Sequence, residues 1–291
     1  MQFIQLVIGG IAQGCIYGLI ALGFVLIYKA TETMSFAQGE FMMLGAFCGL
    51  GLVMATGLPY LLAVPAAVAA MALAGWLIER TTIRPILGQP VFSIVMLTLG
   101  LGYVMRSAIT MIPWVGTETH RLPVPYQGVQ WRWEGLSITA EQFAVVSTTA
   151  VLSVLLYLLF RYTKIGLAMQ AASQNQLAAY CMGIPVRRIN GVVWALAAAT
   201  AGLAGMLLAP LTFVHVNMGF IGLKALPAAV VGGFTSLPGA IVGGLVIGIV
   251  ESLAGFYLPI GVKDVAPYVV VLLMLMLRPH GLFGERLVKK V

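Results

Sequence analysis

Long apolar segments separated by short polar intervals make up most of this 291-residue chain. Spanning a bilayer as a helix takes about 20 apolar residues. Segments that come near this length or exceed it cover residues 3–28, 36–56, 60–78, 91–112, 143–160 and 191–211. The pattern predicts an all-α polytopic membrane protein, folded as a single transmembrane domain over residues 1–291.

The last third of the chain has a different pattern. The apolar segments 223–233 and 265–277 are too short to cross a bilayer at about 1.5 Å per residue, whereas 240–257 is long enough. Residues 234–239, which include a serine and a proline, interrupt the chain between two of these segments. Interrupted apolar segments predict broken or re-entrant half-helices that line a pathway, and a tilted helix pair in a thin region is the alternative. Together with the earlier segments they give about eight membrane helices.

A polar interval, residues 161–190, contains a short helix with its own start and stop signals. Ser173 and Gln176 have the spacing of a capping box, which satisfies unpaired backbone N–H groups at a helix start. Gly183 can take the left-handed conformation that closes a helix, and Pro185 prevents its continuation. A capped helix in a loop of a membrane protein predicts a docking site for a soluble partner.

Composition supports the membrane assignment. The chain is 60% hydrophobic and 9% charged, against about 25% charged residues in soluble domains. The net charge of +7 does not predict nucleic-acid binding, because the basic residues lie at segment ends and form no patch. Many glycines and alanines, as in the runs 195–201 and 232–248, predict close helix packing through small side chains.

Lys and Arg set the expected orientation. The loop 79–90, the interval 161–190 and the tail 278–290 are basic and contain little acid, so the positive-inside rule places them in the cytosol. The loop around 113–142 is richer in acid and aromatic residues and is expected outside. Its alternating residues 129–134 predict a short strand or hairpin, and its tryptophans either contact an external partner or anchor at the lipid headgroups. The side of the N-terminus stays open.

Ionisable side chains inside apolar segments are costly and are therefore candidates for function. Glu40, Arg106 and Glu251 are such residues. Glu40 has either a pathway role or a structural one, because Ser35 and Gln38 have capping-box spacing and would place it at a helix start, where the dipole favours an anion. Arg106 either reaches toward the interface or pairs with Glu251.

Two polar-glycine pairs precede apolar helices, Gln38-Gly39 and the run from Asn217 to Phe220. Free N–H groups at a helix start inside the bilayer can hold a carboxylate, which suits an amino-acid substrate. The candidate pathway residues are Gln38, Gly39, Glu40, Asn217, Gly219, Phe220 and Glu251. Catalytic and ATP-binding motifs are absent from the sequence, the cysteines lack metal-ligand spacing, and no bound cofactor is expected.

Five motifs spread over the chain are the most specific: 35–40 (SFAQGE), 79–85 (ERTTIRP), 219–225 (GFIGLKA), 231–251 (VGGFTSLPGA and its Gly-rich continuation) and 278–284 (RPHGLFG). With them the chain resembles the membrane permeases of ABC-type branched-chain amino acid importers, specifically the smaller of the two paralogous permeases.

The resemblance implies that residues 166–184 form the coupling loop, which inserts into a cleft of the ATPase. Residues carried over from the family are Ala171, Gln174, Asn175, Ala178, Gly183 and Ile184, and the capping pair Ser173 and Gln176 completes the coupling set. The chain departs from the family pattern at Leu167 and Gln170, where basic residues are common, at Asn175, where an acid is common, and at Gln38, where His is frequent.

The resemblance also implies the other subunits of a transport complex in the inner (plasma) membrane of a prokaryote. The chain would be a non-enzymatic permease subunit paired with a second, paralogous permease, with ATP and Mg on two ATP-binding cassette ATPases and a substrate-binding protein outside. It would move branched-chain or related amino acids by alternating access.

Three other functions remain open alternatives. An ion-coupled secondary transporter of small amphiphilic solutes would need cation ligands within the bundle. An intramembrane enzyme would need a catalytic pair, which the sequence does not offer. A channel would leave the docking helix without a purpose.

Overall fold

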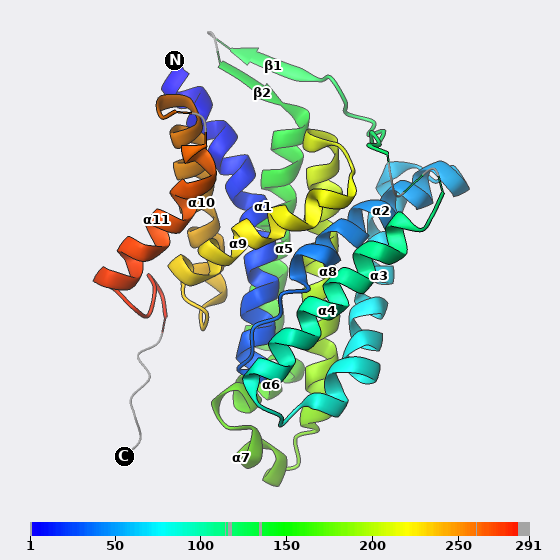
Figure 1. Ribbon diagram of the computed structural model, residues 1–291, viewed down its shortest axis with the longest axis vertical. Helices are drawn as coiled ribbons and strands as arrows, with labels where there is room; N and C mark the ends of the chain where they lie inside the picture. The colour runs from blue at the N-terminus through cyan, green and yellow to red at the C-terminus, as the bar shows by residue number, and fades with distance from the viewer. Residues whose placement is uncertain (1, 114, 116–117, 134–135, 260, 285–291) are drawn as a thin grey trace.

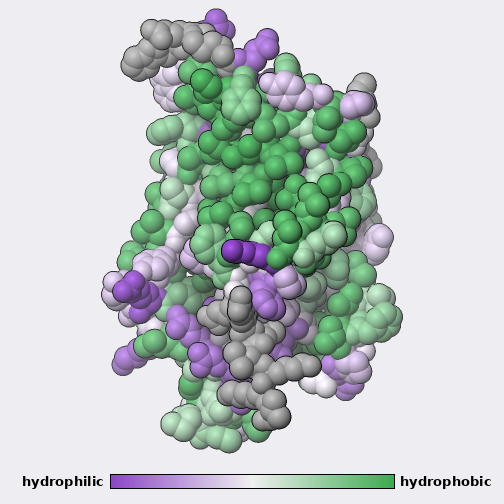
Figure 2. Space-filling view, turned by 90° about the vertical axis from the view of Figure 1, so that its left-hand side faces the viewer, coloured by the Kyte–Doolittle hydropathy of each residue, from purple (hydrophilic) through white to green (hydrophobic). Residues whose placement is uncertain are grey.

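The computed structural model describes residues 2–113, 115, 118–133, 136–259 and 261–284. Among these residues, seven helices are long and apolar enough to cross a membrane. They are α1 (Gln2–Thr31), α2 (Gln38–Thr56), α3 with its π-helical and 3₁₀-helical continuation (Tyr60–Ile86), α4 (Val91–Thr110), α5 (Ala140–Tyr162), α8 (Val186–Thr212) and α10 (Leu237–Tyr257). The prediction of an all-α polytopic membrane protein is confirmed. Figure 2 shows a broad hydrophobic band on one face, with hydrophilic residues gathered above and below it.

The shorter elements connect or flank these spans (Figure 1). The short helices are α6 (Lys164–Gln174), α7 (Gln176–Cys181), α9 (Gly219–Gly232) and α11 (Val262–Leu277). Helix α9 has 14 residues, lies obliquely across the bundle, and ends where Gly233 takes a left-handed φ of 100°. The side chain of Ser236 then caps α10 by accepting from the backbone N–H of Gly239 at 3.1 Å. The predicted interruption between two apolar segments is therefore a break between two helices.

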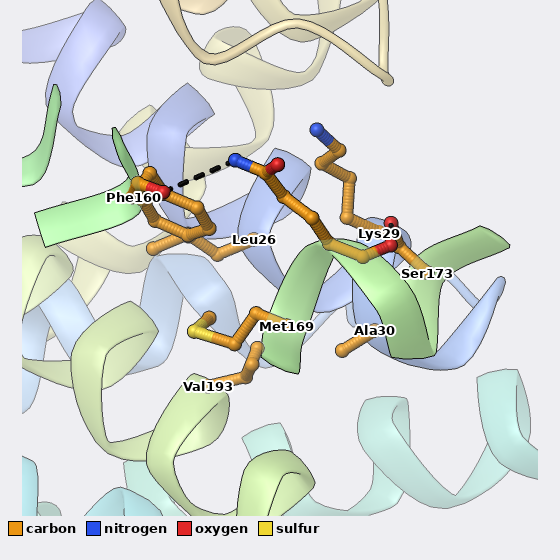
Figure 3. Close-up of a pocket in the computed structure, with 8 residues that line it drawn as sticks. Leu26, Lys29, Ala30, Phe160, Met169, Ser173 and Val193 are labelled. Atoms are coloured by element: carbon orange, nitrogen blue, oxygen red, sulfur yellow. Dashed lines mark hydrogen bonds between the residues drawn. The ribbon is translucent and has the colours of Figure 1, made fainter. Parts of the chain in front are cut away.

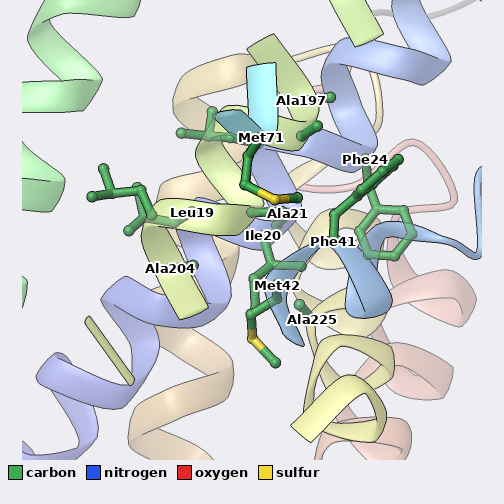
Figure 4. Close-up of a cluster of buried hydrophobic side chains, with 14 of the residues drawn as sticks. Leu19, Ile20, Ala21, Phe24, Phe41, Met42, Met71, Ala197, Ala204 and Ala225 are labelled. Atoms are coloured by element: carbon green, nitrogen blue, oxygen red, sulfur yellow. The ribbon is translucent and has the colours of Figure 1, made fainter. Parts of the chain in front are cut away.

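The core forms around α1 and α8, which are buried along most of their lengths. Large side chains such as Phe24, Phe41 and Met42 fill one part of it, opposite alanines of α8 (Figure 4). Elsewhere α1 and α10 meet through glycines, and a Cβ added at Gly14 would lie 2.7 Å from the carbonyl oxygen of Gly244. The predicted packing through small side chains is confirmed at this contact.

Helix α2 begins deep in the bundle. The connection after α1 runs back along that helix, so that Gln38 reaches the level of Gly23 in α1 (Figure 1). The amide of Gln38 donates to the carbonyl of Ala197 in α8 at 2.8 Å. The predicted capping box of Ser35 and Gln38 is therefore wrong: Ala37 precedes the helix with helical dihedrals and no side-chain cap, because Gln38 bonds to α8 instead.

The loop before α5 contains the predicted hairpin. Strands β1 (Gln130–Trp133) and β2 (Leu136–Thr139) pair antiparallel. Gln5 of α1 holds the hairpin through two hydrogen bonds to the backbone of Ser137, at 2.6 and 3.0 Å. In the same loop, burial raises the pKa of the Tyr126 phenol. Some residues of the segments from which the orientation is predicted lie outside the described residues: Trp114, Glu134, Arg286, Lys289 and Lys290.

Candidate functional site

An ion pair inside the bundle joins α2 to α4. Glu40 lies in the first turn of α2, and its carboxylate accepts hydrogen bonds from the guanidinium of Arg106. The ring of Phe220 in α9 lies 4.1 Å from the guanidinium carbon, within range of a cation–π contact. The two charged side chains are only 12% and 17% exposed, so each charge depends on the other for compensation.

Glycines allow this arrangement because the starts of α2 and α9 touch. A Cβ added at Gly39 would lie 2.2 Å from the carbonyl oxygen of Gly219, and one added at Gly222 would lie 2.2 Å from the Cα of Gly39. A Cβ at Gly219 would lie 2.6 Å from both carboxylate oxygens of Glu40. The carboxylate therefore lies at the first turns of two helices, where the helix dipole stabilises negative charge.

Around this ion pair is a small cavity of about 70 Å³ between α2, α4 and α9, which we call the α2–α4 cleft. Its other walls are aromatic and aliphatic and include Phe36, Leu99, Tyr103 and Leu223. Tyr103 and Phe220 are exposed at the surface of this chain. A pair of opposite charges at the edge of an otherwise apolar face is poorly suited to lipid contact.

The structure brings together most of the predicted pathway residues. Gln38, Gly39, Glu40, Gly219 and Phe220 meet at the contact between the starts of α2 and α9. Asn217 is exposed just before α9, and Glu251 lies in a different cavity.

The predicted pairing of Arg106 with Glu251 is wrong. Arg106 meets Glu40 instead, because the start of α2 reaches the level of Arg106 in α4. Glu251 accepts from the Tyr17 hydroxyl at 2.5 Å and from the Lys224 ammonium at 3.0 Å. Sequence reasoning missed Lys224, although a lysine inside a short apolar segment is itself a signal of a buried charge.

Helices α6 and α7 form a projection at the end of the molecule opposite the hairpin (Figure 1). The predicted capping box of Ser173 and Gln176 is wrong. Ser173 lies inside α6, where its hydroxyl donates to the carbonyl of Gln170 at 2.8 Å. Asn175 caps α7 instead, and its side-chain oxygen accepts from the backbone N–H of Ala178 at 2.9 Å. Asparagine is among the strongest N-cap residues, and its extended backbone separates α6 from α7.

The predicted stop at Gly183 is confirmed. Gly183 has φ = 83°, and its backbone N–H donates to the carbonyl of Tyr180 at 3.0 Å. The N–H of Ile184 donates back to Ala179 at 3.0 Å, which completes the six-residue closure typical of a helix C-terminus. Pro185 then precedes α8.

Helix α7 and the residue directly after it carry large exposed apolar side chains. Leu177, Tyr180 and Met182 are 76%, 71% and 83% exposed. The start of α7 is tied to the bundle, because the amide of Gln176 donates to the carbonyl of Ala30 at the end of α1 at 2.6 Å. Helix α6 adds a second attachment by packing on α1 and α5 around Leu26, Phe160 and Met169 (Figure 3). Of the remaining predicted coupling residues, Gln174 and Ala178 are exposed, and Ala171 and Ile184 are half-buried.

A second ion pair lies at the same end. Glu79, which is fully buried, accepts two hydrogen bonds from Arg84, at 2.8 and 3.2 Å. Arg84 also donates to the carbonyl of Arg187 in the first turn of α8 at 3.3 Å. Sequence reasoning used these residues as part of a motif and counted Arg84 among the basic residues of the loop 79–90, but did not pair them. Their five-residue spacing next to an apolar helix was the available signal.

Comparison with known proteins gives one consistent result. Residues 6–277 match the family model described as branched-chain amino acid transport system, permease component. The chain is 30% identical to the high-affinity branched-chain amino acid transport system permease protein LivH of Escherichia coli (strain K12), over 100% of this chain and 98% of that protein. It is 28% identical to the corresponding permease protein BraD of Pseudomonas aeruginosa, with the same coverage.

A further relative and a solved structure extend the comparison. The probable branched-chain amino acid transport permease protein LivH of Methanocaldococcus jannaschii is 29% identical over 95% of this chain and 91% of that protein. A chain of PsaBC from Streptococcus pneumoniae, solved in complex with Fab, superposes with a TM-score of 0.50 at 13% identity, covering 94% of this chain and 91% of that chain. At this identity the superposition concerns the fold alone.

Proposed function

The chain belongs to the family of branched-chain amino acid transport system permease components, and from that premise we propose the machine in which it works. It is a multi-pass membrane permease subunit. In our proposal it pairs with a second, paralogous permease and receives its driving force from two ATP-binding cassette ATPases, which hold ATP and Mg. A substrate-binding protein delivers branched-chain or related amino acids on the other side.

The observation that carries this proposal is the group of exposed apolar residues in and directly after α7. Leu177, Tyr180 and Met182 lie within six positions of one another, on a segment that projects from the end of the bundle. Large apolar residues gathered on an exposed segment often mark a protein interface. A soluble ATPase is the partner expected at a capped helix outside the apolar band, on the basic end of the chain.

Movement of α7 has a direct route into the spanning helices. The hydrogen bond from Gln176 to Ala30 ties α7 to the end of α1, and α1 packs on α10 along its glycines. Nucleotide binding would favour one arrangement of the bundle over another by contacting α7 differently in each. The coupling residues Ala171, Ser173, Gln174, Asn175, Gln176, Ala178, Gly183 and Ile184 form or flank this connection.

We assign the α2–α4 cleft to the translocation pathway at the face toward the second permease. The buried pair of Glu40 and Arg106 supports this assignment, since a charged edge is tolerated where protein or water covers it and not where lipid does. Low affinity is expected along this pathway, and the substrate-binding protein would supply high affinity.

A pull-down from native membranes in mild detergent tests the proposal. Tagged chain should recover a P-loop ATPase and a second permease. A variant with Leu177, Tyr180 and Met182 changed to serine should lose the ATPase and keep the permease. Serine at three exposed apolar residues of α3 and α4 is the control and should keep the ATPase: Leu61, Leu73 and Met96, which are 76%, 64% and 46% exposed.

Recovery of the chain alone, with solute movement driven by an ion gradient, would contradict the proposal and favour a secondary transporter.

A further inference from the structure

A second and larger cavity lies on the other side of α9. It measures about 450 Å³ and is walled by α1, α5, α8, α9, α10 and α11, and we call it the α1–α10 cavity. Gly219, Phe220 and Leu223 line the α2–α4 cleft, whereas Ile221 and Lys224 line this cavity. Sites for small molecules typically measure about 300–1,000 Å³, so this cavity has ligand size and the cleft does not.

Charged groups of both signs meet in the α1–α10 cavity. Lys224 bridges two carboxylates, Glu251 at 3.0 Å and Asp264 at 2.5 Å. Lys263 also lines the cavity, and Asp264 contacts Lys224 from outside the lining, so the whole cluster contains two cations and two anions. A solute with net charge would leave that charge uncompensated in a low-dielectric space, whereas a zwitterion keeps the balance.

The two principal groups retain capacity for a ligand. An ammonium has three donors and a carboxylate has about four acceptor positions. Among the described residues, Lys224 donates to two carboxylates and Glu251 accepts from Lys224 and Tyr17. The side chain of Asp264 is 69% exposed, so its pair with Lys224 is weak and easily exchanged. A ligand carboxylate can take the place of Asp264 at the same donor.

The remaining walls suit an aliphatic side chain. Ile16, Leu208, Leu211 and Ile221 supply apolar surface beside the charged groups. The cavity lies at the hairpin end of the bundle, because Gln142 in its wall starts α5 directly after β2 (Figure 1). In the proposed orientation, this end faces the substrate-binding protein.

We propose that the α1–α10 cavity is a binding site for a zwitterionic, apolar amino acid within this permease. Lys224 binds the α-carboxylate, and Glu251, held by Tyr17, binds the α-ammonium group. This inference rests on the proposed function and adds a holding site between the binding protein and the α2–α4 cleft.

Photolabelling of the complete transport complex in lipid nanodiscs tests the site. The probe is the diazirine analogue of L-leucine at millimolar concentration, without the binding protein. Mass spectrometry should map the label to α1 residues 9–17 and α9 residues 221–224. Leucine should compete for labelling, whereas 3-methylbutylamine, which lacks the carboxylate, and 4-methylpentanoate, which lacks the ammonium group, should not.

Variants separate recognition from structure. Lys224→Met should lower labelling by about tenfold or more, the loss expected for one charge-assisted hydrogen bond, and Lys224→Arg should restore most of it. Tyr17→Phe keeps the ring and should weaken labelling by a smaller factor. Glu141→Gln is the matched control, because it changes a carboxylate at the same end of the bundle that does not line this cavity, and it should leave labelling here unchanged.

Any of three results would overturn the proposal. The label could be confined to the α2–α4 cleft, the amine or the acid could block labelling as well as leucine does, or Lys224→Met could leave labelling unchanged. ATP-dependent uptake of leucine is measured on the same complex. ATP-dependent uptake without labelling of the α1–α10 cavity would reject only the proposed binding site, whereas absence of ATP-dependent uptake would reject the proposed function.

Discussion

Replacement of Gly183 by valine tests the coupling role of α7 with a strain that can be worked out from the structure. Gly183 has φ = 83°. A non-glycine residue held in this region costs about 1–3 kcal/mol, and a β-branched residue lies at the upper end. The two hydrogen bonds that close α7, at 3.0 Å each, contribute about 1 kcal/mol apiece. The strain energy at Gly183→Val therefore matches or exceeds the free energy that the two hydrogen bonds contribute to closing α7.

A shift of about 2 kcal/mol changes the ratio of closed to open α7 by roughly thirtyfold. Gly183→Val should therefore lower ATP-dependent uptake by about tenfold or more while the protein remains inserted in the membrane. Gly183→Asn should retain most activity, because asparagine tolerates the left-handed region. The assay is uptake of radiolabelled leucine into vesicles that contain the complex and internal ATP.

Gly57→Val is the matched control for backbone strain. Gly57 ends α2 with φ = 67°, and a Cβ would meet nothing within 4 Å at either glycine. The two substitutions therefore carry similar strain, and only one alters α7. Equal loss of uptake in both variants, or normal uptake in Gly183→Val, would refute the reasoning.

Three further predictions concern the start of α2 and the start of α7. Arg106→Met should lower the free energy of unfolding in detergent by about 3 kcal/mol, because it leaves the charge of Glu40 uncompensated. In thermal unfolding, the double variant that also carries Glu40→Gln should recover part of this loss, and strictly additive effects of the two changes would contradict the pairing. Gly39→Ala should prevent correct packing of α2 on α9, seen as loss of monodisperse protein in size-exclusion chromatography, and a normal elution profile would contradict the contact. Asn175→Ala should weaken α7 by about 1 kcal/mol and reduce uptake, whereas Ser173→Ala should have little effect; the reverse order would contradict the assigned cap.

Patterns along the chain predicted those features that depend on neighbouring residues. Apolar segments of bilayer length give spanning helices because no water satisfies the backbone inside lipid. Gly183 is recognisable as a helix end because few other residues adopt a left-handed φ. The alternating residues before α5 likewise form the hairpin.

Features set by tertiary contacts were not predictable in the same way. Arg106 offers no local sign that its partner lies 66 positions earlier, since the pairing depends on how deep α2 begins in the bundle. Gln38 does not form the predicted cap, because its side-chain amide donates to the carbonyl of Ala197 instead. The shift of the α7 cap from Ser173 to Asn175 has a local cause that sequence reasoning missed, namely a second residue of high N-cap preference two positions later.

The central claim is that ATP hydrolysis by a partner drives transport through this permease by way of α7. The most direct test is leucine uptake into vesicles that contain the complex and external binding protein, with no ion gradient across the membrane. The account predicts uptake that requires internal ATP and is lost when Leu177, Tyr180 and Met182 are changed to serine. Uptake that proceeds without ATP, or that survives those changes at full rate, would contradict it.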